Sequence, residues 1–127
     1  MVKEYKTKDS GIRKKYDSGL IRDVQNDKPR FDLLIPNNQK YEDTLLYRWA
    51  MLLERGSKKY DDRNWENANT IEELNRFKAS AWRHFIQAMS GEVDEDYFAA
   101  AVFNLNAVVF LMDTLNVDIK GEKNNGS

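Results

Sequence analysis

The chain has 127 residues, of which 41% are hydrophobic, so its length and composition predict one compact domain. Its 20 Lys and Arg nearly balance 21 Asp and Glu, which leaves no overall positive field for general nucleic-acid binding. The lack of Cys and the single His exclude disulfide frameworks, thiolate zinc sites and a metal site built from several His of one chain.

The first 30 residues carry a local excess of positive charge, with nine Lys or Arg against five acids. Large apolar side chains are few at the start, so residues 1–18 are predicted to form a flexible basic arm. Apolar residues then cluster between Leu20 and Pro36, and Pro29 and Pro36 each disfavour helix in the residue before them. This pattern predicts an extended segment or a short hairpin. No apolar run typical of a secretory signal opens the chain, so we expect a cytoplasmic protein.

A helical pattern begins near residue 40 and predicts an amphipathic helix over about 40–56. Apolar residues recur there at steps of three to four: Leu45, Leu46, Trp49, Leu52 and Leu53. The next residues, 57–70, are rich in Asp and Asn, which favour turns. They are predicted to form a polar loop that contains Trp65.

Two more helices are predicted, over about 72–90 and 94–115. Thr70 followed by Glu73 fits a capping box at the start of the second helix, and Gly91 is placed to end it. The acidic residues before the third helix complement the positive end of its dipole.

The third helix is apolar nearly all round, which predicts that it is either buried or part of a seam between copies. Its apolar run is shorter than a bilayer span and contains Asn104 and Asn106, so a membrane anchor is not expected. A three-helix domain cannot cover every apolar face of this helix, so we expect a homo-oligomer with closed symmetry. The apolar residues that lead to this expectation are Val102, Phe103, Val109, Phe110 and Met112.

The fold class that follows is all-α, a compact domain of about three main helices with an extended N-terminal arm or short hairpin. The helical domain is predicted over 19–117, and 118–127 form a flexible tail. Six residues are predicted to form the core: Trp49, Leu53, Phe77, Ala81, Phe103 and Leu111.

A block of acids lies between the second and third helices, where Glu92, Asp94, Glu95 and Asp96 fall within five positions. Asp96 and Asn104 are eight residues apart and share one face of the third helix. Carboxylate and amide oxygens are ligands that Mg²⁺ accepts, so this pair is a candidate cation or ligand site. The alternatives are helix capping with solvated charges, and a hydrogen bond from Asn104 to a neighbouring helix.

The second helix offers a candidate anion site beside its single His. Polar residues recur at steps of four, three and four: Arg76, Ser80, Arg83 and Gln87. Arg guanidinium groups suit phosphate geometry, although a solvated helix face would show the same spacing. His84 lies on a face with apolar side chains, so it is either a satisfied core residue or a functional group.

The segment 55–65 combines cations, amides and aromatic rings, as a site for a nucleotide requires. The candidate binding residues in it are Lys58, Lys59, Tyr60, Arg63, Asn64 and Trp65. Trp65 is alternatively an apolar plug that fixes the loop to the core. Glu54 is either an exposed partner of Lys58 at the i, i+4 spacing or an inward-facing metal ligand. We expect the pocket between the second and third helices, beneath this loop.

Several blocks of this chain, in order, resemble a family common in bacteriophages, the N-terminal domain of dATP/dGTP diphosphohydrolases. The matching blocks are residues 18–23, 28–33, 55–60, 63–66, 76–77, 80, 83–84, 91–96 and 104. That family is similar to the all-α nucleoside triphosphate pyrophosphohydrolases of the MazG type.

The resemblance implies a metal-dependent pyrophosphohydrolase that cleaves a purine deoxynucleoside triphosphate, in the host cytoplasm if the protein is encoded by a phage. It implies Mg²⁺ or Mn²⁺ held by Glu54, Glu92 and Asp96. The implied catalytic residues are Glu54, Asp96 and His84. The implied substrate-binding residues are Lys58, Lys59, Tyr60, Arg63, Asn64, Trp65, Arg76, Ser80, Arg83 and Asn104.

A second hypothesis follows from a missing pair of acids. Enzymes of the MazG type carry Glu-x-x-Glu on one helix, whereas Met51 and Ser57 stand three positions either side of Glu54 here. The chain is then a non-catalytic nucleotide-binding protein that sequesters a host nucleotide signal, as a phage countermeasure to host defence would. A third hypothesis is an interaction protein whose apolar third helix forms an oligomer seam.

Overall fold

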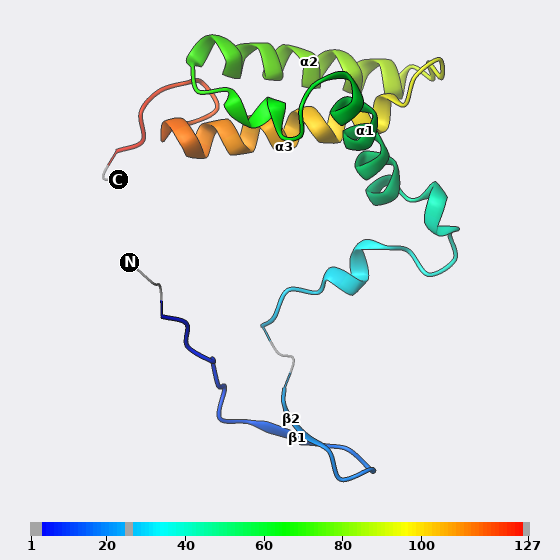
Figure 1. Ribbon diagram of the computed structural model, residues 1–127, viewed down its shortest axis with the longest axis vertical. Coiled ribbons are helices and arrows are strands. Elements are labelled where there is room, and N and C mark those ends of the chain that lie inside the picture. The colour runs from blue at the N-terminus through cyan, green and yellow to red at the C-terminus, as the bar shows by residue number, and fades with distance from the viewer. Residues whose placement is uncertain (1–3, 25–26, 126–127) are drawn as a thin grey trace. The chain divides into compact units, whose positions relative to one another are not determined.

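The computed structural model describes residues 4–24 and 27–125, and it is mostly helical, as predicted (Figure 1). Its chain groups into two compact units, Met1–Leu33 and Leu34–Ser127. The predicted domain boundaries at residues 18 and 117 stay predictions. The elements in chain order are β1 (Arg13–Lys15), β2 (Ile21–Asp23), η1 (Phe31–Leu34), η2 (Tyr41–Asp43), α1 (Leu45–Lys59), η3 (Asn64–Asn67), α2 (Ile71–Met89) and α3 (Tyr97–Leu115).

The N-terminal unit contains a small antiparallel hairpin. Lys14 of β1 lies opposite Arg22 of β2, and Gly19 turns the chain with a φ of 91° that favours glycine. The backbone N–H of Tyr16 donates to the Leu20 carbonyl at 2.8 Å and closes the turn. A hairpin was predicted between residues 20 and 36, but β1 lies earlier, within the segment predicted as an arm. Residues 31–34 form the 3-10 helix η1 rather than an extended segment.

Helix α1 begins later than the predicted residue 40, because Tyr41–Asp43 form the separate 3-10 turn η2. Thr44 is almost fully buried and caps α1 by accepting a hydrogen bond from the Tyr47 backbone at 3.2 Å. The helix passes through Gly56 and ends at Lys59. Apart from its chain neighbours and its own helix backbone, no described atom lies within 4 Å of where a Gly56 Cβ would stand.

Helices α2 and α3 are joined by a short turn and lie side by side (Figure 1). The predicted capping box is confirmed: Thr70 Oγ1 accepts from the Glu73 backbone at 3.1 Å, and Glu73 Oε1 accepts from the Asn69 backbone at 3.0 Å. Gly91 follows α2 with a φ of 84°, which confirms its predicted place at the end of the helix.

The core lies between α2, α3 and the segments at their ends. Leu74 of α2 and Leu111 of α3 are fully buried, and they are joined by Ala68, Val108 and Val117. Of the predicted core residues, Leu111 and Ala81 are buried and Phe77 packs against this cluster. Leu53 was predicted to be in the core but is 39% exposed. The reason is that α1 packs mainly against α3 and contributes no buried residue of its own.

The segment after α3 folds back on the helix. Val117 forms an isolated antiparallel bridge with Lys123, and the Asn124 backbone donates to the Asn116 carbonyl at 3.1 Å.

Among the described residues, α3 is the helix whose length and composition would allow it to cross a membrane.

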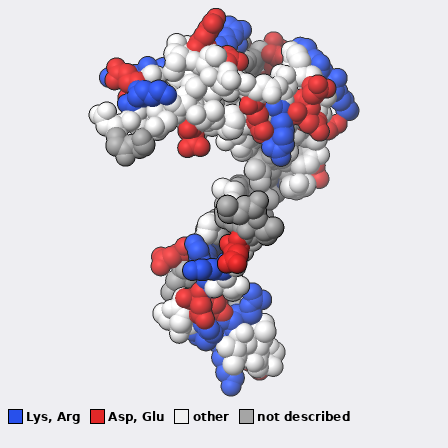
Figure 2. Space-filling model, turned by 60° about the vertical axis from the view of Figure 1, so that its left-hand side comes forward, with Lys and Arg blue, Asp and Glu red and all other residues white. Residues whose placement is uncertain are grey.

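Surface charges are mixed in sign. Figure 2 shows Lys and Arg interspersed with Asp and Glu on the face that it presents, which agrees with the near-neutral net charge of −1.

Candidate functional site

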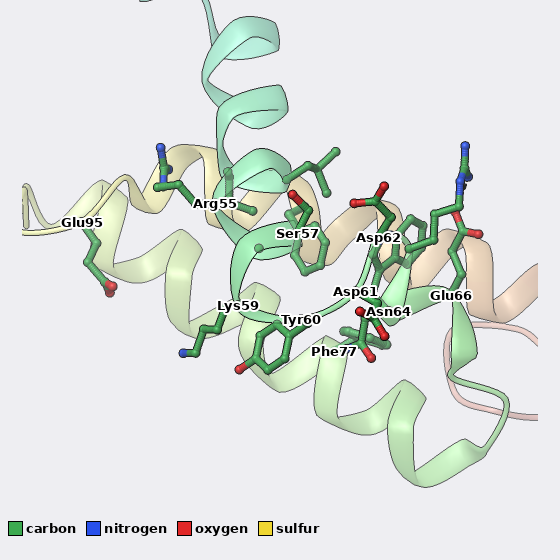
Figure 3. A pocket seen from close by; sticks show the side chains of 16 residues that line it. Arg55, Ser57, Lys59, Tyr60, Asp61, Asp62, Asn64, Glu66, Phe77 and Glu95 are labelled. Atoms are coloured by element: carbon green, nitrogen blue, oxygen red, sulfur yellow. Dashed lines mark hydrogen bonds and ion pairs between the residues drawn. The ribbon is translucent and has the colours of Figure 1, made fainter.

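A pocket of about 880 Å³ lies where α1 ends and η3 begins (Figure 3). Helix α1 and the turn that follows it supply most of its walls, together with Phe77 of α2, and Glu95 and Phe103 of the third-helix region. The predicted pocket lay between the second and third helices, so the structure shifts it toward α1. Its lining residues that bear charge or an aromatic ring are Arg55, Lys59, Tyr60, Asp61, Asp62, Arg63, Trp65, Glu66, Phe77, Glu95 and Phe103.

The turn that forms one wall follows from the local sequence. The Tyr60 backbone N–H donates to the Gly56 carbonyl at 2.8 Å and closes α1, and the Asn64 N–H donates to the Asp61 carbonyl at 3.1 Å. Arg63 adopts a left-handed conformation with a φ of 59°, which is uncommon for a residue other than glycine. Its guanidinium donates to Glu66 Oε1 at 2.7 Å, so a local ion pair stabilises the bend.

Trp65 fixes this turn to α3. Its ring packs edge-on against Phe103 and Phe110, with centroid distances of 5.9 and 5.1 Å. This contact favours the plug interpretation of Trp65, although the residue also lines the pocket. Tyr60 is more than half exposed, and Lys59 Nζ lies 5.4 Å from its ring centroid. The ring accessible for stacking is therefore that of Tyr60.

The charges of the pocket are only partly separated, because Glu95 lies on the side of Arg55 and Lys59 in Figure 3, and Arg63 pairs with Glu66. In the view of Figure 3, Arg55 and Lys59 lie on one side of Tyr60, and Asp61, Asp62 and Glu66 on the other. Among the described residues, neither Arg55 nor Lys59 forms an ion pair within 4.0 Å, but the charge of Arg55 acts on Asp96 and contributes to the lowered pKa of that carboxyl. Three bases and four acids line the pocket, which gives it a net formal charge of −1.

The predicted metal ligands do not come together within the part of the chain that the structure describes. Glu54 pairs with Lys58 at 3.3 Å, which is the alternative raised above, and Glu92 is exposed. No group of three His, Asp or Glu side chains among residues 4–24 and 27–125 is placed to hold a metal ion. Among the described residues, Glu54, Glu92 and Asp96 are therefore not brought together as a three-carboxylate site, and the binding of Mg²⁺ or Mn²⁺ stays a prediction.

Asp96 has a different role. Its carboxylate accepts two hydrogen bonds from Arg48, at 2.8 and 2.6 Å, and a third from the Ala99 backbone at 3.2 Å. The hydrogen bonds from Arg48 are the largest cause of a pKa for Asp96 below its usual value. Asp96 thus joins α1 to the start of α3 and caps α3. Sequence analysis did not identify Arg48 as the partner of Asp96, because the two residues are 48 positions apart and no local pattern links them.

The His84 side chain has both a hydrogen-bond partner and a stacking partner within the chain. Its Nδ1 lies 3.1 Å from Gln87 Oε1, and its ring stacks on that of Tyr97 at 5.8 Å. The Tyr97 hydroxyl donates to Asp94 at 2.8 Å, and this hydrogen bond is the main reason why the pKa of Tyr97 is raised to about 12. His84 does not line the pocket.

The other predicted binding residues divide into two groups. Lys59, Tyr60, Arg63, Asn64 and Trp65 line the pocket. The residues that do not line it are Lys58, Arg76, Ser80, Arg83 and Asn104.

Exposure and hydrogen bonding show where four of the five residues outside the pocket lie instead. Arg76 and Arg83 are exposed on α2, whereas Ser80 and Asn104 are buried. Asn104 Nδ2 donates to the Ala100 carbonyl of its own helix at 2.8 Å.

Several pocket residues were missed from the sequence. Arg55, Asp61, Asp62 and Glu66 lay within or beside the segment singled out, but their composition is that of an ordinary polar turn. Glu95 belongs to the acidic block between α2 and α3, and no sequence pattern distinguished it from the other acids of that block.

Comparison with known proteins identifies the family of the chain. The family described as dATP/dGTP diphosphohydrolase, N-terminal, matches residues 19–119, which include the whole pocket. No curated protein and no solved structure matches the chain. The chain belongs to the family of dATP/dGTP diphosphohydrolase N-terminal domains.

Proposed function

We propose that this chain binds a purine deoxynucleoside triphosphate, or a related nucleotide, in the pocket at the end of α1 and hydrolyses its α–β phosphoanhydride. The observation that carries the proposal is that two cations, Arg55 and Lys59, line the pocket beside the exposed ring of Tyr60. A volume of about 880 Å³ lies within the range of small-molecule sites. The description of the family, dATP/dGTP diphosphohydrolase, N-terminal, supports a purine deoxynucleotide as the ligand.

In this proposal, the two ends of the nucleotide lie on opposite sides of Tyr60. Arg55 and Lys59 bind the phosphates through charge-assisted hydrogen bonds. The base stacks on Tyr60, as bases do on exposed aromatic rings. Asp61 and Asp62 accept hydrogen bonds from the exocyclic amino group of a purine, and the amide of Asn64 reads the same edge.

Hydrolysis requires a base for the attacking water. In the view of Figure 3, Glu95 is the pocket carboxylate on the side of Arg55 and Lys59. In this proposal it accepts the proton as water attacks the α-phosphorus and the bond to the bridging oxygen breaks. The products are a nucleoside monophosphate and pyrophosphate. Because the predicted metal ligands are not brought together among the described residues, no step is assigned to a metal.

A second candidate function is nucleotide sequestration without turnover. It is favoured by the engagement of Asp96 with Arg48 and by the lack of a metal-binding group of acids among the described residues. Such a protein would use the same cations and the same aromatic ring.

One experiment tests the proposal and separates the two candidates. Purified protein is incubated with dATP, dGTP, dCTP and dTTP, with Mg²⁺, with Mn²⁺ and with a chelator, and the products and the nucleotide released on denaturation are quantified. The proposal predicts monophosphate and pyrophosphate from purine substrates, and loss of turnover without loss of binding in Glu95→Gln. Unchanged nucleotide recovered from denatured protein would establish sequestration, and neither products nor bound nucleotide would refute both.

A further inference from the structure

The hairpin of the N-terminal unit holds two like charges directly opposite each other. Lys14 of β1 is paired with Arg22 of β2, and both side chains are exposed. We call these two residues the cation row. Among the residues that the structure describes, no acid forms an ion pair with either of them. Like charges that face each other across two strands destabilise the pairing, so an anion bound between them would stabilise the hairpin.

The acids nearest to the cation row are engaged elsewhere. Asp9 binds Arg13 at 2.7 Å, and Asp23, which lies opposite Arg13 in the hairpin, is 3.5 Å from its guanidinium. Asp23 also pairs with Lys28 at 3.4 Å. Because side chains alternate between the two faces of a strand, these ion pairs leave the cation row on the opposite face.

An aromatic ring and apolar side chains flank the cation row on its own face. Hydrogen bonds from the Tyr16 backbone to the Leu20 carbonyl and from the Val24 backbone to the Ile12 carbonyl continue the pairing beyond both ends of the strands. The alternation of side chains then places Tyr16, Leu20 and Ile12 on the face of the cation row. Tyr16 is 45% exposed, and Lys14 Nζ lies 5.7 Å from its ring centroid.

The hairpin has little packing of its own. All three residues of β1 are exposed, and in β2 only Asp23 is half-buried. A two-stranded hairpin of this size is marginally stable in water without further contacts. A ligand on the face of the cation row would supply such contacts.

From these observations we propose that the hairpin binds single-stranded nucleic acid, with phosphates at the cation row and a base stacked on Tyr16. Proteins bind single strands through this combination of cations along the backbone and exposed aromatic rings. A duplex is disfavoured because its bases are stacked inside the helix, where Tyr16 cannot reach them. An acidic peptide offers no base to the ring.

The charge of the chain agrees with a local site of this kind. The net charge of −1 excludes a positive field over the whole surface, whereas the first 30 residues hold nine Lys or Arg against five acids. None of the hairpin residues lines the nucleotide pocket, and the inference does not depend on the proposed function.

Fluorescence anisotropy of a labelled oligothymidylate of about twenty nucleotides tests the proposal on the full chain, in about 20–200 mM salt. Each neutralised phosphate contributes about −0.7 to the slope of log affinity against log salt concentration, so the two cations predict a wild-type slope of about −1.4 or steeper. Lys14→Gln, and separately Arg22→Gln, should make the slope shallower by about 0.7 and weaken binding about tenfold at about 20 mM salt.

Further variants separate the parts of the site. Tyr16→Ala should weaken binding about tenfold without changing the salt slope, and Tyr16→Phe should bind as the wild type does. Lys120→Gln, at an exposed lysine outside the hairpin, is the matched control. Lys59→Gln alters the nucleotide pocket, and both of these variants should keep wild-type affinity for the oligonucleotide. Amide chemical shifts of residues 13–23 check that each variant keeps the hairpin, which is expected because backbone hydrogen bonds form the pairing.

Several results would overturn the proposal. One is unchanged anisotropy up to about 100 µM protein at low salt. Another is the same affinity and salt slope in the wild type, Lys14→Gln and Arg22→Gln. Binding that Lys59→Gln abolishes and the hairpin variants retain would place the oligonucleotide in the pocket instead. Tighter binding to phosphatidylserine vesicles than to the oligonucleotide would assign the hairpin to an anionic lipid surface.

Discussion

Replacing Asp96 by Asn should lower the free energy of unfolding by about 1–2 kcal/mol, because it removes the charge from a two-point hydrogen bond with Arg48. Charge-assisted hydrogen bonds contribute about 1.5–3 kcal/mol when well buried. The Arg48 and Asp96 side chains are 36% and 21% exposed, so solvent screening reduces that figure. Asn retains an N-cap for α3, whereas Asp96→Ala also loses the cap and should cost about 1 kcal/mol more.

Urea unfolding followed by circular dichroism measures these differences. Glu54→Gln is the matched control, because it breaks the exposed Glu54–Lys58 pair and should cost less than about 0.5 kcal/mol. A double-mutant cycle with Arg48→Gln should return a favourable coupling energy between the two sites. An Asp96→Asn protein as stable as the wild type would refute the role assigned to this pair.

The same pair makes stability depend on pH. Because the folded state lowers the pKa of Asp96 below 3.8, its contribution is present above that value and is lost as the pH falls through the folded pKa. Wild-type stability should therefore fall more steeply than that of Asp96→Asn below about pH 4. Parallel curves for the two proteins would contradict this assignment.

Three further changes test the fold and the site. Thr70→Ala should cost about 1 kcal/mol in urea unfolding, because it removes the cap of α2, and no change would contradict the capping box. Trp65→Ala should lower the free energy of unfolding by about 2–4 kcal/mol and weaken nucleotide binding, since the turn that bears the pocket loses its contact with α3. Tyr97→Phe should lower the free energy of unfolding in the same assay, because it removes the hydroxyl that donates to Asp94, and an unchanged value would contradict a stabilising role for this hydrogen bond.

The helices were predictable because their signals are local. Apolar spacing, the Thr70–Glu73 capping box and the glycine after α2 each act within a few residues, and the structure places all three as predicted. The start of α1 was misplaced because Tyr41–Asp43 form a separate turn.

The candidate site was predictable only in part. The segment 59–65 stood out because cations, amides and aromatic rings seldom occur together, and it lines the pocket. The roles of Asp96 and Arg83 depended on contacts between distant segments. Periodicity places a side chain on a face of a helix, but it cannot show that Arg48 pairs with Asp96, or that Arg83 does not line the pocket.

The most direct test of the central claim is calorimetric titration of dATP, or of a non-hydrolysable analogue, into the wild-type chain, Lys59→Ala and Lys58→Ala. The two lysines are neighbours in sequence, but only Lys59 lines the pocket, and Lys58 pairs with Glu54. Loss of a charge-assisted contact of about 1.5–3 kcal/mol predicts roughly ten- to a hundredfold weaker binding in Lys59→Ala, and affinity close to wild type in Lys58→Ala. Equal affinities in all three proteins would contradict the placement of the nucleotide in this pocket.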